Sequence, residues 1–219
     1  MQSTKNLQMN NIKAQTKKSQ SQISSAEALN FLKKGNERFL NKNFVERDYK
    51  SQISDTSNGQ YPFSIVLSCI DSRVPVETIF DQGIGDIFSA RVAGNVISKD
   101  VLGSIEYACK YAGVKLIVIL GHTSCGAVKG ACDGLEDGNL THLLQKIKPA
   151  IDKTKTDQSE MRNSSNIHFV NSVANNNLNN SINDIKSHSS ILKEMIDSDK
   201  VSICSAMYDV ETGIVNFKN

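Results

Sequence analysis

Two short motifs of this 219-residue sequence contain side chains that could together do chemistry. Residues 68–73, SCIDSR, supply a thiol at Cys69, a carboxylate at Asp71 and a guanidinium at Arg73. Residues 121–126, GHTSCG, supply an imidazole at His122 and a second thiol at Cys125. Alternate side chains of an extended chain share a face, so the three groups of the first motif can point the same way. The two motifs therefore offer four possible metal ligands and one cation.

Thiolate, imidazole and carboxylate groups are the ligands that zinc binds in tetrahedral sites. Cys69, Asp71, His122 and Cys125 would fill one such site, with one Zn²⁺ per chain. Two thiolates and a carboxylate carry one negative charge more than Zn²⁺ neutralises. If water replaces Asp71, the ligand set becomes neutral with the metal, and bound water can then have a pKa near ~7. Arg73 could hold Asp71 off the metal through a bidentate pair, so that the two side chains act as a gate.

Both motifs follow apolar segments that the sequence predicts to be buried strands. Residues 61–68 and 115–120 are rich in aliphatic and β-branched side chains, and each segment ends at a polar turn. Strand ends are the expected place for a site in an open α/β sheet. We therefore expect the two motifs to meet at one edge of a sheet.

Strands and helices alternate through the middle of the chain, which predicts an α/β fold with a mostly parallel central sheet flanked by helices. Further strands are expected at residues 87–93 and 201–208, and an antiparallel edge strand at residues 214–217 near the C-terminus. Residues 49–60 are predicted to be a loop. Helices are expected over residues 25–41 (an N-terminal helical arm), 101–111, 124–131 and 140–151, with a further one beginning at 188 or 189.

The segment 154–180 is rich in asparagine and looks like low-complexity sequence. However, Ile167, Val170, Ala174 and Leu178 recur every three or four residues, which is helical spacing. We therefore expect a helix whose asparagines lie on its exposed face, rather than a disordered linker.

Length and composition indicate a single domain over residues 25–219, preceded by a mobile N-terminal extension over residues 1–24 that is poor in apolar side chains. The net charge of +2 gives no reason to expect a nucleic-acid or membrane partner. No apolar run approaches the ~18 residues of a membrane span, and no apolar signal core is visible, so a cytoplasmic location is expected. Cys109, Cys132 and Cys204 are expected to be small buried hydrophobic residues.

The two motifs closely resemble those of the β-class carbonic anhydrases of bacterial type. The resemblance extends from about residue 25 to residue 217 and includes GNERF at 35–39, IFSARVAGN at 87–95 and AMYDVETG at 206–213. It implies zinc held by Cys69, His122 and Cys125, with Asp71 or water in the fourth position. It also implies Asp71 and Arg73 as the catalytic pair, and reversible hydration of carbon dioxide to bicarbonate and a proton by attack of zinc-bound hydroxide on CO₂.

The resemblance further implies a homodimer or homotetramer, with the site near a subunit interface and the N-terminal helix over the neighbouring subunit. Gln82 lies near a substrate-contacting glutamine of some members, but in a turn that is one residue longer. Other members have an inhibitory bicarbonate site of Trp, Arg and Tyr. Arg91 and Tyr208 match two of these residues, whereas Val66 stands at the Trp position and the chain has no Trp, so such regulation is not expected.

Alternative functions stay open at this level. A zinc hydrolase of a related small heterocumulene, CS₂ or COS, could use the same ligands and differ only in access to the pocket. A non-catalytic zinc-holding protein is another possibility, against which the presence of both Asp71 and Arg73 argues. A cysteine phosphatase is disfavoured, because the three residues between Cys69 and Arg73 are too few to form a phosphate-cradling loop.

Overall fold

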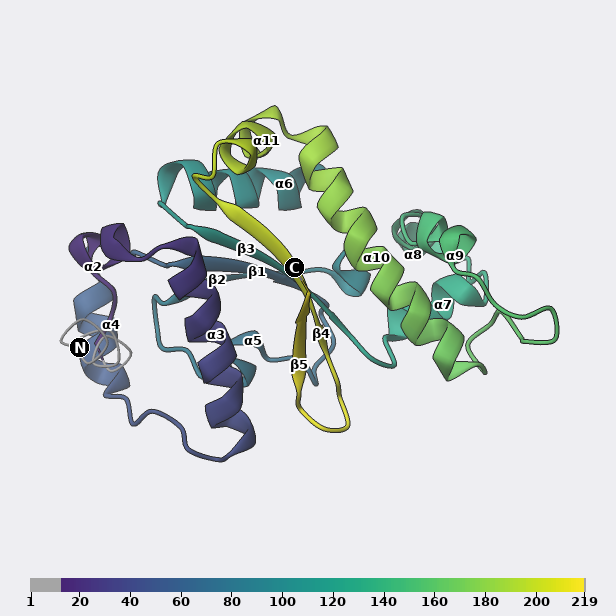
Figure 1. The fold of residues 1–219 in the computed structure, drawn as a ribbon, viewed down its shortest axis with the longest axis horizontal. Helices are drawn as coiled ribbons and strands as arrows, with labels where there is room; N and C mark the ends of the chain where they lie inside the picture. The colour runs from purple at the N-terminus through teal and green to yellow at the C-terminus, as the bar shows by residue number, and fades with distance from the viewer. Residues whose placement is uncertain (1–12, 219) are drawn as a thin grey trace.

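The computed structural model describes residues 13–218. A five-stranded sheet with the order β2-β1-β3-β4-β5 forms its centre (Figure 1). The first four strands in that order are parallel, and β5 is antiparallel to β4. This arrangement confirms the predicted α/β fold with its antiparallel C-terminal edge. The strands are β1 (Ser64–Ser68), β2 (Ile87–Arg91), β3 (Leu116–His122), β4 (Ser202–Tyr208) and β5 (Val215–Lys218).

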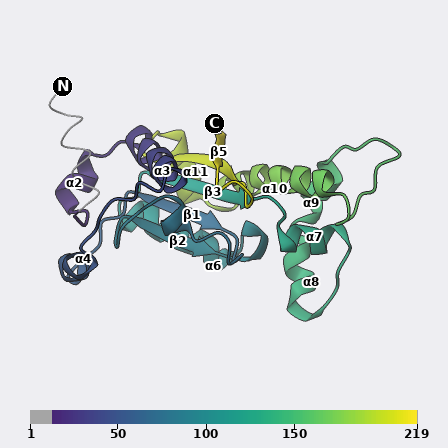
Figure 2. The ribbon, with the colours of Figure 1, turned by 90° about the horizontal axis from the view of Figure 1, so that it is seen from below.

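Helices cover both faces of the sheet, and Figure 2 shows α3 and α6 on opposite sides of the strands. The helices are α2 (Lys17–Gln22), α3 (Ser25–Leu40), α4 (Tyr49–Thr56), α5 (Val76–Ile79), η1 (Ala93–Asn95), α6 (Lys99–Glu106), η2 (Tyr107–Tyr111), α7 (Gly126–Cys132), α8 (Gly138–Gln145), α9 (Lys148–Lys153), α10 (Ile167–His188) and α11 (Ser190–Asp197). None of the helices within residues 13–218 is both long enough and apolar enough to cross a bilayer.

The alternation of side chains along β1 divides the core into two layers. Ile65 and Leu67 pack with α6, α10 and α11, whereas Val66 packs with α3 and α5. All residues of β1 and β3 are buried. Continuous burial is what parallel strands covered on both faces require, and it explains why the sequence of each strand is apolar without alternation.

Three predictions of secondary structure differ from the structure in detail. Residues 49–60, predicted as a loop, contain α4, because the Asp48 carboxylate caps that helix by accepting a hydrogen bond from the amide of Ser51. The predicted helix 140–151 is divided into α8 and α9, with Pro149 in the first turn of α9, where its missing amide costs nothing. The helix predicted over 101–111 ends in the π-helical turn η2.

The asparagines of α10 also differ from the prediction. The helix is present, but Asn177 and Asn180 are buried rather than exposed. A buried amide is stable only where its polar atoms find partners. Asn177 finds one in the backbone of a neighbouring turn, since its Nδ2 donates to the carbonyl of Gly94.

Residues 13–24, the part of the predicted mobile extension that the structure describes, are more ordered than the composition suggests. Of the predicted mobile extension, residues 1–12 lie outside the described residues, while residues 13–24 pack on the domain and contain α2, with Thr16 as its cap. The side chain of Gln20 is buried and donates 2.7 Å hydrogen bonds to the carbonyls of Pro62 and Ala112. These two hydrogen bonds hold α2 beside the segments that precede β1 and β3. The amino-acid composition of the N-terminal segment gives no sign of such contacts.

Candidate metal centre

The parallel pairing of β1 and β3 brings the two motifs together. Ser68 pairs with Leu120, so Cys69 leaves β1 at the level where β3 reaches its last two residues. His122 is the last residue of β3, and Cys125 precedes the first residue of α7. The two motifs thus meet at the carboxyl edge of the sheet, as the sequence predicts.

Cys69, His122 and Cys125 form one buried group at that edge. Each offers one ligand atom, and these atoms all lie within 4.8 Å of one another. The two sulfur atoms are 3.9 Å apart. Within residues 13–218, this is the one group of three or more His, Cys, Asp or Glu side chains close enough to hold a common metal ion.

The hydrogen bonds of His122 fit a metal ligand. Its Nδ1 lies 2.9 Å from the carbonyl oxygen of Thr123, and a carbonyl can only accept, so Nδ1 carries the proton and donates. Nε2 therefore has the free lone pair, and this buried atom has no hydrogen-bond partner. A buried polar atom without a partner costs about 1–3 kcal/mol. A metal ion between Nε2 and the two sulfur atoms would remove that cost, and the S₂N donor set suits zinc.

The two thiols are in direct contact, and each affects the protonation of the other. Either sulfur could be the donor in this contact; with Cys125 as the donor, the hydrogen bond lowers the pKa of Cys69 well below its usual value despite burial. The same contact with a thiolate raises the pKa of Cys125. One thiolate is thus already favoured in the metal-free protein, and a bound cation would favour the second.

Asp71 and Arg73 form the bidentate pair that the motif predicts. Arg73 Nε donates to Oδ1 at 2.9 Å and its terminal nitrogen to Oδ2 at 2.7 Å. These hydrogen bonds hold the pKa of Asp71 at about 2. Oδ2 also lies 3.7 Å from the free Nε2 of His122. The Asp71 carboxylate therefore lies between the Arg73 guanidinium and the Cys69–His122–Cys125 group. It accepts hydrogen bonds from the guanidinium.

Two further side chains shape the ends of the motifs, and the sequence analysis missed both roles. Arg91, from β2, donates to the carbonyl oxygens of Cys69 at 3.0 Å and Asp71 at 2.6 Å. Asn171, from α10, accepts the amide of Ser124 at 2.9 Å, where the backbone has a φ of +55°. The resemblance singled out Arg91, but for a different role, and nothing in the sequence pairs Asn171 with the second motif.

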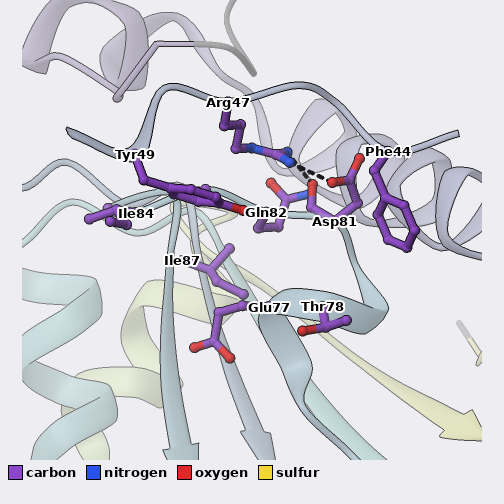
Figure 3. A pocket seen from close by; sticks show the side chains of 11 residues that line it. Phe44, Arg47, Tyr49, Glu77, Thr78, Asp81, Gln82, Ile84 and Ile87 are labelled. Atoms are coloured by element: carbon purple, nitrogen blue, oxygen red, sulfur yellow. Dashed lines mark hydrogen bonds and ion pairs between the residues drawn. The ribbon is translucent and has the colours of Figure 1, made fainter. Parts of the chain in front are cut away.

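Gln82 lines a cavity of about 400 Å³ (Figure 3). Its Nε2 donates to the carbonyl of Phe80, and the cavity is also lined by Arg47, Tyr49 and Ile84. None of the residues of the metal group, nor Asp71 or Arg73, lines this cavity. A direct role for Gln82 at the metal centre of its own chain therefore has no support in the geometry.

Two of the three remaining cysteines are buried as predicted, and the third is more exposed than predicted. Cys109 and Cys204 are buried, and Cys132 is half-buried. Burial raises the pKa of Cys109 to about 12 and the pKa values of Cys132 and Cys204 to about 11. All three therefore stay protonated at neutral pH.

The fold and the site define an α/β protein with a buried Cys–His–Cys group at the carboxyl ends of parallel strands. The family model described as carbonic anhydrase matches residues 64–215, which include both motifs. This chain belongs to the carbonic anhydrase family, and its fold is that of the β class.

Individual relatives agree with this assignment. Carbonic anhydrase 2 of Mycobacterium tuberculosis is 44% identical over 129 residues, and the match covers 55% of this chain and 61% of that relative's length. A carbon disulfide hydrolase of Acidithiobacillus thiooxidans is 35% identical over 77 residues, 32% of this chain and 36% of that protein. A crystal structure from a study of two tetrameric β-carbonic anhydrases of Sordaria macrospora superposes with a TM-score of 0.64 at 25% identity, covering 88% of this chain and 94% of that one. This chain therefore matches about three fifths of the length of the first relative.

Proposed function

We propose that this protein is a zinc lyase, a carbonate dehydratase that reversibly hydrates carbon dioxide to bicarbonate and a proton. The observation that carries the proposal is the buried Cys69–His122–Cys125 group, with Asp71 beside it and paired to Arg73. A zinc ion bound there would supply a Lewis acid that brings the pKa of coordinated water toward ~7. Membership of the carbonic anhydrase family supports the same reaction.

The ligand roles follow from the donor atoms. Cys69 and Cys125 would hold zinc through their sulfur atoms and His122 through Nε2, with one ion per chain. The Thr123 carbonyl supports this arrangement, because it keeps the proton of His122 on Nδ1 and leaves Nε2 as the ligand atom. Metal binding would also release the proton that the two thiols share, since a zinc ligand must be a thiolate.

Asp71 and Arg73 would act as a gate on the fourth metal position. Oδ2 of Asp71 lies 3.7 Å from the ligand atom of His122, so a small movement would carry it to a metal held there. The bidentate pair with Arg73 opposes that movement and would leave the fourth position of a bound zinc ion to water. Open and closed states would thus differ by which cation the carboxylate contacts.

The substrate and partners belong to the same proposal. Carbon dioxide and bicarbonate are the proposed ligands, in a homodimer or homotetramer. The relatives from Sordaria macrospora are tetrameric, which supports an assembly of this kind. A cytoplasmic location completes the proposal, and fractionation of the source cells would test it.

Metal analysis and stopped-flow kinetics test the proposal directly. The purified chain should contain one zinc per chain and should acidify a CO₂-saturated buffer faster than the uncatalysed reaction. Cys125→Ser replaces a thiolate by a poor ligand and should lose both zinc and activity, whereas Cys132→Ser, outside the metal group, should keep both. A zinc-loaded wild type without CO₂ hydration at alkaline pH would refute the assignment.

A second candidate function rests on the carbon disulfide hydrolase relative. The same ligand set could hold zinc for attack on CS₂ or COS, and only access to the pocket would differ. Turnover of CO₂ and CS₂ by the same preparation separates the two functions. We expect CO₂ to be the better substrate, and a higher kcat/KM for CS₂ would favour the second candidate.

A further inference from the structure

The turn η1 (Ala93–Asn95) lies against the metal group and has an unusual backbone. Gly94 and Asn95 both have positive φ, 65° and 44°. For a residue with a side chain, the left-handed conformation costs about 1–2 kcal/mol. A Cβ atom on Gly94 would also lie 2.8 Å from Cδ1 of Ile147. The turn therefore needs glycine at this position and contacts that hold it in place.

This conformation directs one backbone donor at a proposed zinc ligand. The amide of Gly94 donates to Sγ of Cys69 at 3.3 Å. Both residues are buried, so water does not compete for either atom. A hydrogen bond to a sulfur ligand stabilises its thiolate form and fixes the direction in which its remaining lone pairs point.

Helix α10 supplies the contacts that hold the turn. Nδ2 of Asn177 donates to the carbonyl of Gly94 at 2.8 Å, and Oγ of Ser181 donates to the carbonyl of Asn95 at 3.1 Å. The two donors are four residues apart, so they share one face of the helix. Each of these two side chains is 2% exposed, which leaves the two carbonyls dependent on them.

We propose that Asn177 is a positioning residue for the metal centre: it holds the Gly94 carbonyl so that the Gly94 amide stays on the sulfur of Cys69. The metal-related part of this inference rests on the proposed function, whereas the hydrogen bonds from Asn177 to Gly94 and from Gly94 to Cys69 do not. The Asn177 side chain has no hydrogen bond with a proposed metal ligand or with the Asp71–Arg73 pair, so it acts through Gly94.

Asn176 provides a matched control on the same helix. It is the neighbouring residue, and its Nδ2 donates to Oγ1 of Thr154 at 2.8 Å rather than to the turn. Asn176→Leu and Asn177→Leu therefore remove the same chemical group and one comparable hydrogen bond each. Only the second variant frees the Gly94 carbonyl.

Two measurements on the full chain test the proposal. The first is amide hydrogen exchange of Gly94 in the metal-free protein, and the second is zinc affinity by competition with a chelator. In Asn177→Leu, the Gly94 amide should exchange at least about tenfold faster. The Gly94 carbonyl loses its hydrogen bond from Asn177, and the hydrogen bond from the Gly94 amide to Cys69 then weakens. Zinc should bind about 10–100-fold more weakly, which is the usual effect of losing a residue that orients a ligand. Asn176→Leu should stay within about twofold of wild type in both.

The outcomes separate this inference from the proposed function. A folded Asn177→Leu protein with Gly94 exchange and zinc affinity both within about twofold of wild type would overturn the inference. If that variant does not fold, the smaller change Asn177→Ala is judged by the same two criteria. A wild type that binds zinc without hydrating CO₂ would overturn the proposed function alone, because neither measurement depends on turnover.

Discussion

The variant Arg73→Ala tests the proposed gate, because the Arg73 guanidinium is the group that would hold the Asp71 carboxylate away from a bound metal ion. The bidentate pair lowers the pKa of Asp71 from its usual 3.8 to about 2. At about 1.4 kcal/mol per pKa unit, the pair is worth at most about 2.5 kcal/mol. The side chain of Arg73 is 49% exposed, so solvent screening reduces that value to about 1 kcal/mol.

Removing the pair should shift Asp71 toward the metal by that free energy. One kcal/mol corresponds to about a fivefold change in an equilibrium constant, so the ratio of open to closed sites should fall by about fivefold. Stopped-flow CO₂ hydration should show kcat/KM lowered by up to about fivefold through this shift, and further if Arg73 also orients the substrate. Zinc content should be unchanged, since Asp71 becomes a fourth protein ligand.

Two further variants sharpen the result. Arg73→Lys keeps the charge but cannot form two parallel hydrogen bonds, so its activity should fall between wild type and Arg73→Ala. Arg162→Ala removes a guanidinium that donates to the carbonyls of Ile151 and Thr154, away from the metal group, and should leave kcat/KM unchanged. An Arg73→Ala enzyme with full zinc and undiminished kcat/KM would refute the gate.

The remaining predictions concern the metal, the protein's pH dependence and the turn beside Cys69. Treatment with a strong chelator at neutral pH should remove zinc and abolish CO₂ hydration, and added Zn²⁺ should restore it; activity that survives complete metal removal would contradict the site. Burial raises the pKa of Asp86 to about 6. Ionisation of this carboxyl therefore destabilises the folded state, and the loss of folding free energy grows as the pH rises from about 4 through about 6. Asp86→Asn, which can still accept the amide of Gly83, should therefore raise the free energy of unfolding at pH 7.5 by about 1–3 kcal/mol and have little effect at pH 4; urea melts at both pH values check this, and a variant less stable at pH 7.5 would contradict it. Gly94→Ala should lower the free energy of unfolding by about 1–3 kcal/mol, because it adds backbone strain and a contact with Ile147; a thermal melt identical to wild type would show that the turn adapts freely.

The sequence alone determined the parts of this protein that depend on local chemistry. The apolar segments before the two motifs predicted β1 and β3, because continuous burial leaves a continuous apolar run. The bidentate pair of Asp71 and Arg73 was also predictable, since the two side chains are two residues apart in the chain. His122 and Cys125 are likewise close in sequence, so their meeting needs only one turn.

The approach of Cys69 to those two residues was predictable for a different reason. Strand ends of a parallel sheet lie at one edge, so two motifs that each follow a buried strand meet if the strands are neighbours. The sheet places β1 beside β3 in the required register. The residues of both motifs also carried the family resemblance, which the family model confirms.

Only the tertiary structure decided what surrounds the site. Helical periodicity predicted α10, but not that Asn171 and Asn177 would turn inward to backbone groups of Ser124 and Gly94, the latter 83 residues away in sequence. Arg91 likewise reaches the carbonyls at the end of β1 only because β2 pairs beside it. The physical reason is that a polar side chain is stable inside a protein wherever an unpaired backbone group meets it. Which backbone groups remain unpaired depends on how the turns pack, and one segment's sequence does not contain that information.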